Sequence, residues 1–142
     1  MTTPNSAVGN TSSQGWETGV RRTFSLTPAQ AWTILFSQPV LGAWLDNKAL
    51  LTFQPGDTYT TTAGITITVT SVTEVKVIRM KWQHKGQTNT STLQIRVIPA
   101  KEKTTISFHH EWLANSQERE EMKIYWSHVL DEIKKITDSQ TH

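Results

Sequence analysis

Apolar and polar residues alternate with a period of two through most of the chain, which is typical of an antiparallel sheet with one face in water. A first strand is predicted over residues 17–26, with Val20, Arg22, Phe24 and Leu26 on one side. The same alternation recurs between Leu50 and Leu113, where turn signals such as Lys85-Gly86 separate the strands. These further strands are predicted over residues 58–62, 65–70, 78–82, 93–97 and 106–112. In the last of them, Trp112 shares the apolar side with Phe108.

Two short stretches with helical spacing follow the first strand. Thr27, Pro28 and Gln30 fit the N-cap, first and third positions of a capping box, so a helix is predicted to begin here. Pro39 interrupts this helix because proline lacks the backbone donor and clashes with the preceding turn. A second short helix is therefore predicted through residues 40–45.

A long amphipathic helix is predicted over residues 116–137. Asn115 can cap its start, with Glu118 reaching back, and Lys134 and Lys135 lie near its negative end. Apolar residues at helical spacing form one stripe along it. The stripe contains Met122, Tyr125, Trp126, Val129, Leu130, Ile133 and Ile136.

The ends of the chain lack this patterning. Residues 1–15 are polar and aperiodic, so they cannot bury enough surface to offset their ordering entropy. We expect a disordered tail over 1–15, one domain over 16–138 and a disordered C-terminus over 139–142. A chain of 142 residues is also of single-domain size.

Composition excludes several classes of protein. There is no cysteine, which rules out disulfides, thiolate zinc sites and a cysteine nucleophile. Lysine and arginine number 14 against 12 acidic residues, and no basic run exceeds two, so nucleic acid is not the expected partner. No apolar stretch approaches the roughly 18 residues of a membrane span, and the start of the chain does not read as a signal peptide. We therefore expect a soluble, cytoplasmic protein.

Several segments, in this order, resemble the START-like (Bet v 1-like) superfamily. They are Arg22-Thr-Phe-Ser-Leu-Thr-Pro-Ala-Gln-Ala-Trp32, Trp44-Leu45, Ile78-Arg-Met-Lys-Trp82 and Ser91-Thr-Leu-Gln-Ile-Arg-Val97. The most similar branch is the one related to the C-terminal domain of the activator of Hsp90 ATPase. The resemblance implies an α+β helix-grip fold, in which a curved sheet of six or seven antiparallel strands wraps the long C-terminal helix. It also implies a space between sheet and helix that can hold a lipid-, polyketide- or flavonoid-like molecule.

The apolar faces of these elements supply the walls of such a cavity. A strongly curved sheet cannot lie flush along a straight helix, so side chains must fill the gap or leave a pocket. The alternative is that these residues interdigitate as an ordinary core. The candidate lining consists of Trp44, Ile67, Val69, Ile78, Met80, Trp82, Leu93, Ile95, Ile106, Phe108, His110, Met122, Tyr125, Trp126, Val129 and Ile133.

Two adjacent histidines, His109 and His110, are candidates for metal binding or acid–base chemistry. On a strand His109 and His110 face opposite sides and cannot bind one ion, whereas His109 and Glu111 share the solvated side and can pair. We expect no metal and no cofactor. The inward His110 is the single candidate general base, on the expectation that its position places its pKa near working pH. The sequence has no Gly-x-Ser-x-Gly elbow.

Three functions are compatible with these observations. The first is binding of a small, mainly hydrophobic molecule, with the proline-interrupted residues 39–45 as the gate. The second is a protein-interaction or stress-response module related to the Hsp90 activator, although that activator uses a second, N-terminal domain for which this chain has no room. The third, a cyclase-like or hydrolytic enzyme, has only His110 and the cavity in its favour.

Overall fold

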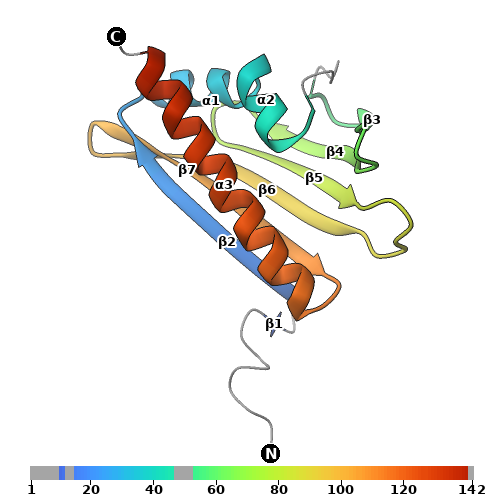
Figure 1. Ribbon diagram of the computed structural model, residues 1–142. Coiled ribbons are helices and arrows are strands. Elements are labelled where there is room, and N and C mark those ends of the chain that lie inside the picture. Colours follow the sequence, from blue (N-terminus) through green and yellow to red (C-terminus); the bar gives the residue numbers. More distant parts are fainter. Residues whose placement is uncertain (1–9, 12–14, 47–52, 141–142) are drawn as a thin grey trace, which may run out of the picture.

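The computed structural model describes residues 10–11, 15–46 and 53–140. Seven antiparallel strands form one sheet in the order β1-β2-β7-β6-β5-β4-β3. The helix α3 crosses one face of this sheet, here called the inner face, and α1 and α2 lie together at one end of it (Figure 1). The strands are β1 (Asn10–Thr11), β2 (Gly15–Phe24), β3 (Thr58–Thr60), β4 (Thr66–Thr73), β5 (Val77–Gln83), β6 (Ser91–Ala100) and β7 (Lys103–Leu113). The α+β helix-grip fold predicted from the sequence is confirmed.

The strand register places the apolar sides of the predicted strands on the inner face, with the exception of Trp112 described below. Phe108 on β7 lies between Val20 on β2 and Ile95 on β6, and Ile95 in turn pairs with Ile78 on β5. Residues at these inward positions on β4 to β7 are almost completely buried. The outer face of the sheet carries the polar half of the alternation, as a one-sided sheet requires.

The first helix after β2 begins where the sequence predicts, and the second begins two residues earlier than predicted. In α1 (Pro28–Leu35) the Gln30 amide donates to Thr27 Oγ1 at 3.1 Å, and the Thr27 amide donates to Gln30 Oε1 at 2.9 Å. This reciprocal pair confirms the capping box. The second helix, α2 (Gln38–Trp44), has Pro39 in its first turn. The proline therefore starts the second helix, where its missing donor costs nothing, and the break lies just before it.

The helix α3 (Ser116–Gln140) is also capped as predicted. The Glu118 amide donates to Asn115 Oδ1 at 2.8 Å, while the Glu118 carboxylate accepts from the Ala114 amide at 2.9 Å. Its last residues, Ser139 and Gln140, fall in the segment expected to be disordered. The Asp131 carboxylate accepts from the Arg22 guanidinium at 2.6 Å, which connects α3 to β2. Among the described residues, no helix is long and apolar enough to span a membrane.

The prediction for Trp112 is wrong, and a β-bulge is the reason. Thr18 pairs with His110, but Trp16 pairs with Leu113, so β7 has one residue more than β2 in this interval. Trp112 adopts a φ of 59° and its side chain turns outward, with 46% of the residue exposed. Because the bulge shifts the alternation by one, Leu113 returns to the inner face and is buried.

The start of the chain also differs from the prediction. Asn10 pairs with Trp16 and Thr11 with Gly15, so part of the expected tail forms a short strand. The remainder of that tail lies outside the described residues, as does Leu50.

Candidate functional site

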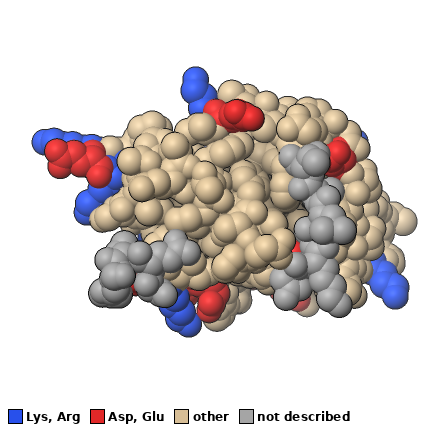
Figure 2. Space-filling view, turned by 90° about the horizontal axis from the view of Figure 1, so that it is seen from above, with Lys and Arg blue, Asp and Glu red and all other residues tan. Residues whose placement is uncertain are grey.

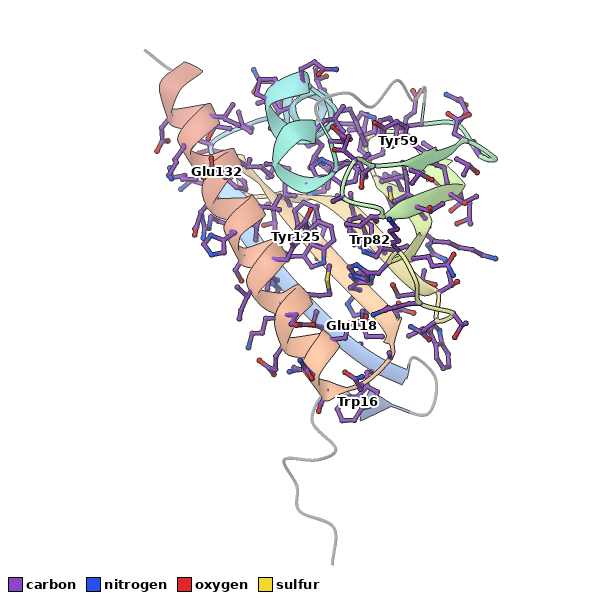
Figure 3. The ribbon with its side chains drawn as sticks, turned by 45° about the vertical axis from the view of Figure 1, so that its right-hand side comes forward. Trp16, Tyr59, Trp82, Glu118, Tyr125 and Glu132 are labelled. Carbon is purple, nitrogen blue, oxygen red and sulfur yellow. The ribbon has the colours of Figure 1, made fainter. Side chains whose placement is uncertain are left out.

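The structure brings the predicted cavity residues together in one core, as a layer between the sheet and α3 that Trp44 extends under α2. All of them are buried except Tyr125, which is partly buried. Tyr125 projects from α3 and Trp82 from the sheet into this layer (Figure 3). Three hollows on the surface, of about 340, 470 and 440 Å³, are lined by other residues.

Aromatic rings occupy the centre of this layer. Trp126 on α3 stacks on Phe108 of β7, with ring centroids 4.7 Å apart and planes 10° apart. Trp82 and Tyr125 meet the same indole edge-on, at 5.3 and 4.9 Å. We call Trp82, Phe108, Tyr125 and Trp126 the aromatic cluster. Offset and edge-to-face arrangements of this kind are the favoured ones for aromatic pairs.

His110 lies beside the aromatic cluster and uses both ring nitrogens. Its Nδ1 accepts from Trp126 Nε1 at 3.1 Å, and its Nε2 lies 2.7 Å from Ser91 Oγ. An indole N–H can only donate, so Nδ1 carries no proton and Nε2–H is the donor to Ser91. The Ser91 hydroxyl then donates to the Trp82 carbonyl at 3.0 Å. These bonds form a continuous chain from α3 through β7 and β6 to β5.

Burial also determines the charge of His110. Desolvation, followed by the charges of His84 and His109, lowers the pKa of His110 to about 3. The neutral imidazole is therefore the form present near neutral pH, and protonation of Nδ1 would break the bond from Trp126. The expectation of a pKa near working pH is not met, because the ring is completely buried. In this geometry His110 donates to Ser91 and does not accept its proton.

One buried donor in this layer has no acceptor. Among the described residues, no hydrogen-bond partner lies within reach of Trp82 Nε1, although the residue is only 1% exposed. The neighbouring polar groups are engaged elsewhere, since His110 bonds as above and the Tyr125 hydroxyl donates to the Trp44 carbonyl at 2.7 Å. An unsatisfied buried donor costs about 1–3 kcal/mol and is rare in native proteins.

Polar tethers hold α2 against the rest of the domain. Burial raises the pKa of Tyr125 to about 12, so its hydroxyl stays protonated and keeps its bond to the Trp44 carbonyl. Trp44 Nε1 donates to the Leu35 carbonyl at 2.9 Å, which joins α2 to α1. After α2, the buried Asp46 accepts from the Tyr59 hydroxyl at 3.1 Å and from the Thr62 amide at 3.0 Å. The predicted gate is therefore fastened to α3, α1 and the β3–β4 turn.

Sequence reasoning missed Asp46 and Ser91. Asp46 directly follows the apolar Trp44-Leu45 pair. A carboxylate next to buried apolar residues could have indicated a buried side chain that hydrogen-bonds to its neighbours. Ser91 begins the alternation of β6 on its inward side, which was the corresponding signal for a buried hydroxyl. Neither signal indicates which residues the buried group bonds to, because the hydrogen-bond partners of Asp46 and Ser91 come from other parts of the chain.

The outer face of β7 carries a second polar group. His109 Nε2 lies 3.4 Å from Glu111 Oε1 and 3.6 Å from Glu17 Oε1. His109 and Glu111 share the outer side as predicted, but Glu111 is only 9% exposed, so this part of the outer face is not solvated as expected. Within the described part of the chain, no group of three or more histidine or acidic side chains is arranged to hold a metal ion.

Comparison with protein families extends these observations. Residues 25–138 match the family model described as activator of Hsp90 ATPase homolog 1-like protein. No curated protein matches the sequence.

Solved structures with the same fold have low sequence identity to this chain. Protein MLL2253 from Mesorhizobium loti has a TM-score of 0.74 at 16% identity, covering 87% of this chain and 97% of its own. The Hsp90 activator PFC0360w from Plasmodium falciparum has a TM-score of 0.70 at 18% identity, covering 86% and 96%. CalU16 from Micromonospora echinospora has a TM-score of 0.68 at 14% identity, covering 84% and 74%. At these identities the likeness extends to the fold alone.

Proposed function

The chain belongs to the activator of Hsp90 ATPase homolog 1-like family, and from this premise we propose that it binds a small, mainly hydrophobic molecule between the sheet and α3. The family's fold is compatible with such binding. Burial of the ligand's own apolar surface against the aromatic cluster would contribute about 25 cal/mol per Å².

The unsatisfied N–H of Trp82 is the observation that carries this proposal. A ligand with a carbonyl, ester or ether oxygen would accept from it and remove the cost of leaving a buried donor without a partner. A few placed polar groups in an apolar site orient the ligand, and Trp82 would do so here. The preferred ligand is therefore apolar over most of its surface, with one hydrogen-bond acceptor.

Admission of a ligand requires a side chain to move, and Tyr125 is the candidate. It is the partly buried member of the aromatic cluster, and it is fastened to the Trp44 carbonyl on α2. Neither α1 nor α2 carries a charged side chain, and the surface at that end of the molecule is mostly uncharged (Figure 2). A displacement of α2 with Tyr125 would open the layer without exposing or burying an ion pair.

The test is a panel of lipid-, polyketide- and flavonoid-like compounds, read by melting temperature and tryptophan emission. We expect compounds with an acceptor oxygen to raise the melting temperature. In Trp82→Phe their affinity should fall by about two- to tenfold relative to acceptor-free analogues, since one hydrogen bond is removed. Trp112→Phe is the matched control, because it changes an exposed indole on the outer side. No shift with any compound, or equal weakening in both variants, would refute the proposal.

A second candidate is action on a chaperone, for which the fold of the Plasmodium falciparum Hsp90 activator is the supporting observation. We expect the full chain to leave the ATPase rate of Hsp90 unchanged if ligand binding is its function. A reproducible rise in that rate would favour the second candidate over the first.

A further inference from the structure

A polar hollow of about 470 Å³ lies at the end of the sheet where the β3–β4 and β5–β6 turns meet. Its size is within the range of small-molecule sites. Its lining is polar or glycine throughout, in contrast to the layer beneath α3. The side chains that could contact a ligand there come from Thr60, Thr62, Thr66, Gln83, His84 and Lys85.

Both turns are held by hydrogen bonds, so the walls of the hollow are preformed. In the β3–β4 turn the Thr61 amide donates to the Ile65 carbonyl at 2.8 Å, and the Ile65 amide donates back to Thr61 Oγ1 at 3.0 Å. The Thr62 amide donates to Asp46, as described above. In the β5–β6 turn, Gln83 Nε2 donates to the Gln87 carbonyl at 2.8 Å. Preformed walls lower the entropy lost when a ligand binds.

Gly64 determines where Lys85 lies. A Cβ on Gly64 would stand 2.8 Å from the Cβ and 3.0 Å from the Cδ of Lys85, and the φ of Gly64 is +90°. The lysine stem therefore packs across a position that only glycine leaves open. Within the described parts of the chain, Lys85 has no ion pair, and no acidic residue lines the hollow.

Threonine hydroxyls supply further donors. Thr60 Oγ1 and Thr66 Oγ1 lie 2.9 Å apart, so one hydroxyl donates to the other. The accepting hydroxyl keeps its own proton free to donate outside the pair. The Thr62 hydroxyl donates to Asp46 Oδ2 at 3.2 Å and offers its lone pairs as acceptors. The hollow thus combines the ammonium group of Lys85, the imidazole of His84, a free hydroxyl donor, and amide and hydroxyl groups.

We propose that this hollow binds a small polyol that carries an oxyanion, such as a sugar phosphate. Lys85 and the free threonine hydroxyl bind the oxyanion, because charge-assisted hydrogen bonds are the strong ones. The Gln83 and Thr62 side chains bind hydroxyl groups of the polyol. This site is separate from the one proposed under α3, since none of the predicted cavity residues lines it.

The experiment is a titration of the full chain, followed by amide chemical shifts, with glucose 6-phosphate, inorganic phosphate and glucose at constant ionic strength. We expect saturable shifts at Gly64, Thr66 and Gly86 with glucose 6-phosphate, weaker binding of phosphate, and weakest binding of glucose. In Lys85→Met, which keeps the stem over Gly64 but removes the charge, affinity for glucose 6-phosphate should fall about tenfold or more.

Lys123→Met is the matched control, because Lys123 is an exposed lysine on α3. It should bind as the unchanged protein does. Four results would overturn the proposal: no saturable shift with any probe, shifts centred on another surface, equal binding of glucose and its phosphate, or equal loss of affinity in Lys85→Met and Lys123→Met. Failure here would leave the melting-temperature test of the interior site unaffected, since that test uses different residues and apolar compounds.

Discussion

Two histidines that are neighbours in the sequence occupy opposite environments. His110 faces α3, is fully buried and has both nitrogens bonded to fixed partners. His109 faces outward, where its side chain is 29% exposed and lies near two carboxylates. Their different roles come from the side of the strand each occupies. The comparison teaches that strand alternation assigns a histidine to an environment, and that the environment then determines which protonation state is stable.

The largest expected effect comes from removing the buried ring. His110→Ala would leave a cavity beside Trp126 and deprive the Trp126 N–H of its acceptor. We expect a loss of about 3–5 kcal/mol in the free energy of unfolding, measured by urea denaturation. A loss below about 1 kcal/mol would show that the hydrogen-bond chain does not stabilise the fold.

Removing the Ser91 hydroxyl, which lies in the middle of the hydrogen-bond chain, should lower the free energy of unfolding by less than His110→Ala does. Ser91→Ala would leave the His110 Nε2–H without an acceptor while keeping the ring in place. We expect a loss of about 2–3 kcal/mol, together with altered ¹⁵N shifts of the His110 ring. If the ring shifts were unchanged, the assignment of the proton to Nε2 would be wrong.

A fall in pH should destabilise the protein through His110. The pKa of His110 is lowered to about 3 in the folded protein, against about 6.5 when unfolded, so the unfolded chain binds the extra proton first. The contribution of neutral His110 to the free energy of unfolding is therefore present above pH 6.5 and is lost progressively as the pH falls toward 3. Between pH 6.5 and 5 we expect a loss of about 2 kcal/mol in urea denaturation. The loss should disappear in His110→Gln and persist in His109→Gln, and the opposite pattern would reverse the assignment.

The smallest effect is expected on the outer face. His109→Ala removes a partly exposed ring whose Nε2 lies 3.4 and 3.6 Å from Glu111 and Glu17 and makes no hydrogen bond to a described residue, so few interactions are lost. We expect a change below about 1 kcal/mol in the free energy of unfolding. If His109→Ala lowered the free energy of unfolding as much as His110→Ala, the two faces of the sheet would not differ in how much their histidines stabilise the fold.

Patterns local in the sequence predicted most of the fold. The sequence alone predicts the capping box at Thr27, the apolar stripe of α3 and the alternation of the strands. Each of these patterns depends on residues within a few positions of one another. The bulge at Trp112 was not, since an extra residue in β7 is defined only against the register of β2.

The candidate site was predictable only in part. The sequence identified which side chains point inward, and the structure brings them together. The bonds from His110 to Ser91 and Trp126 join three separate elements, so no local pattern encodes them. The missing acceptor of Trp82 is likewise a property of the whole packed layer, and it could only be seen once every neighbour was placed.

The bulge also limits how the length of β7 can vary. Deleting Trp112 would remove the extra residue and restore strict alternation, with the leucine after Glu111 still on the inner face. A single insertion between His110 and Leu113 would instead turn Leu113 toward water, and the cap at Asn115 would follow a strand ending in the wrong orientation. Insertions that the protein tolerates should therefore fall in the β4–β5 or β6–β7 turns, and relatives that retain the fold are expected to keep the spacing between Leu113 and the start of α3.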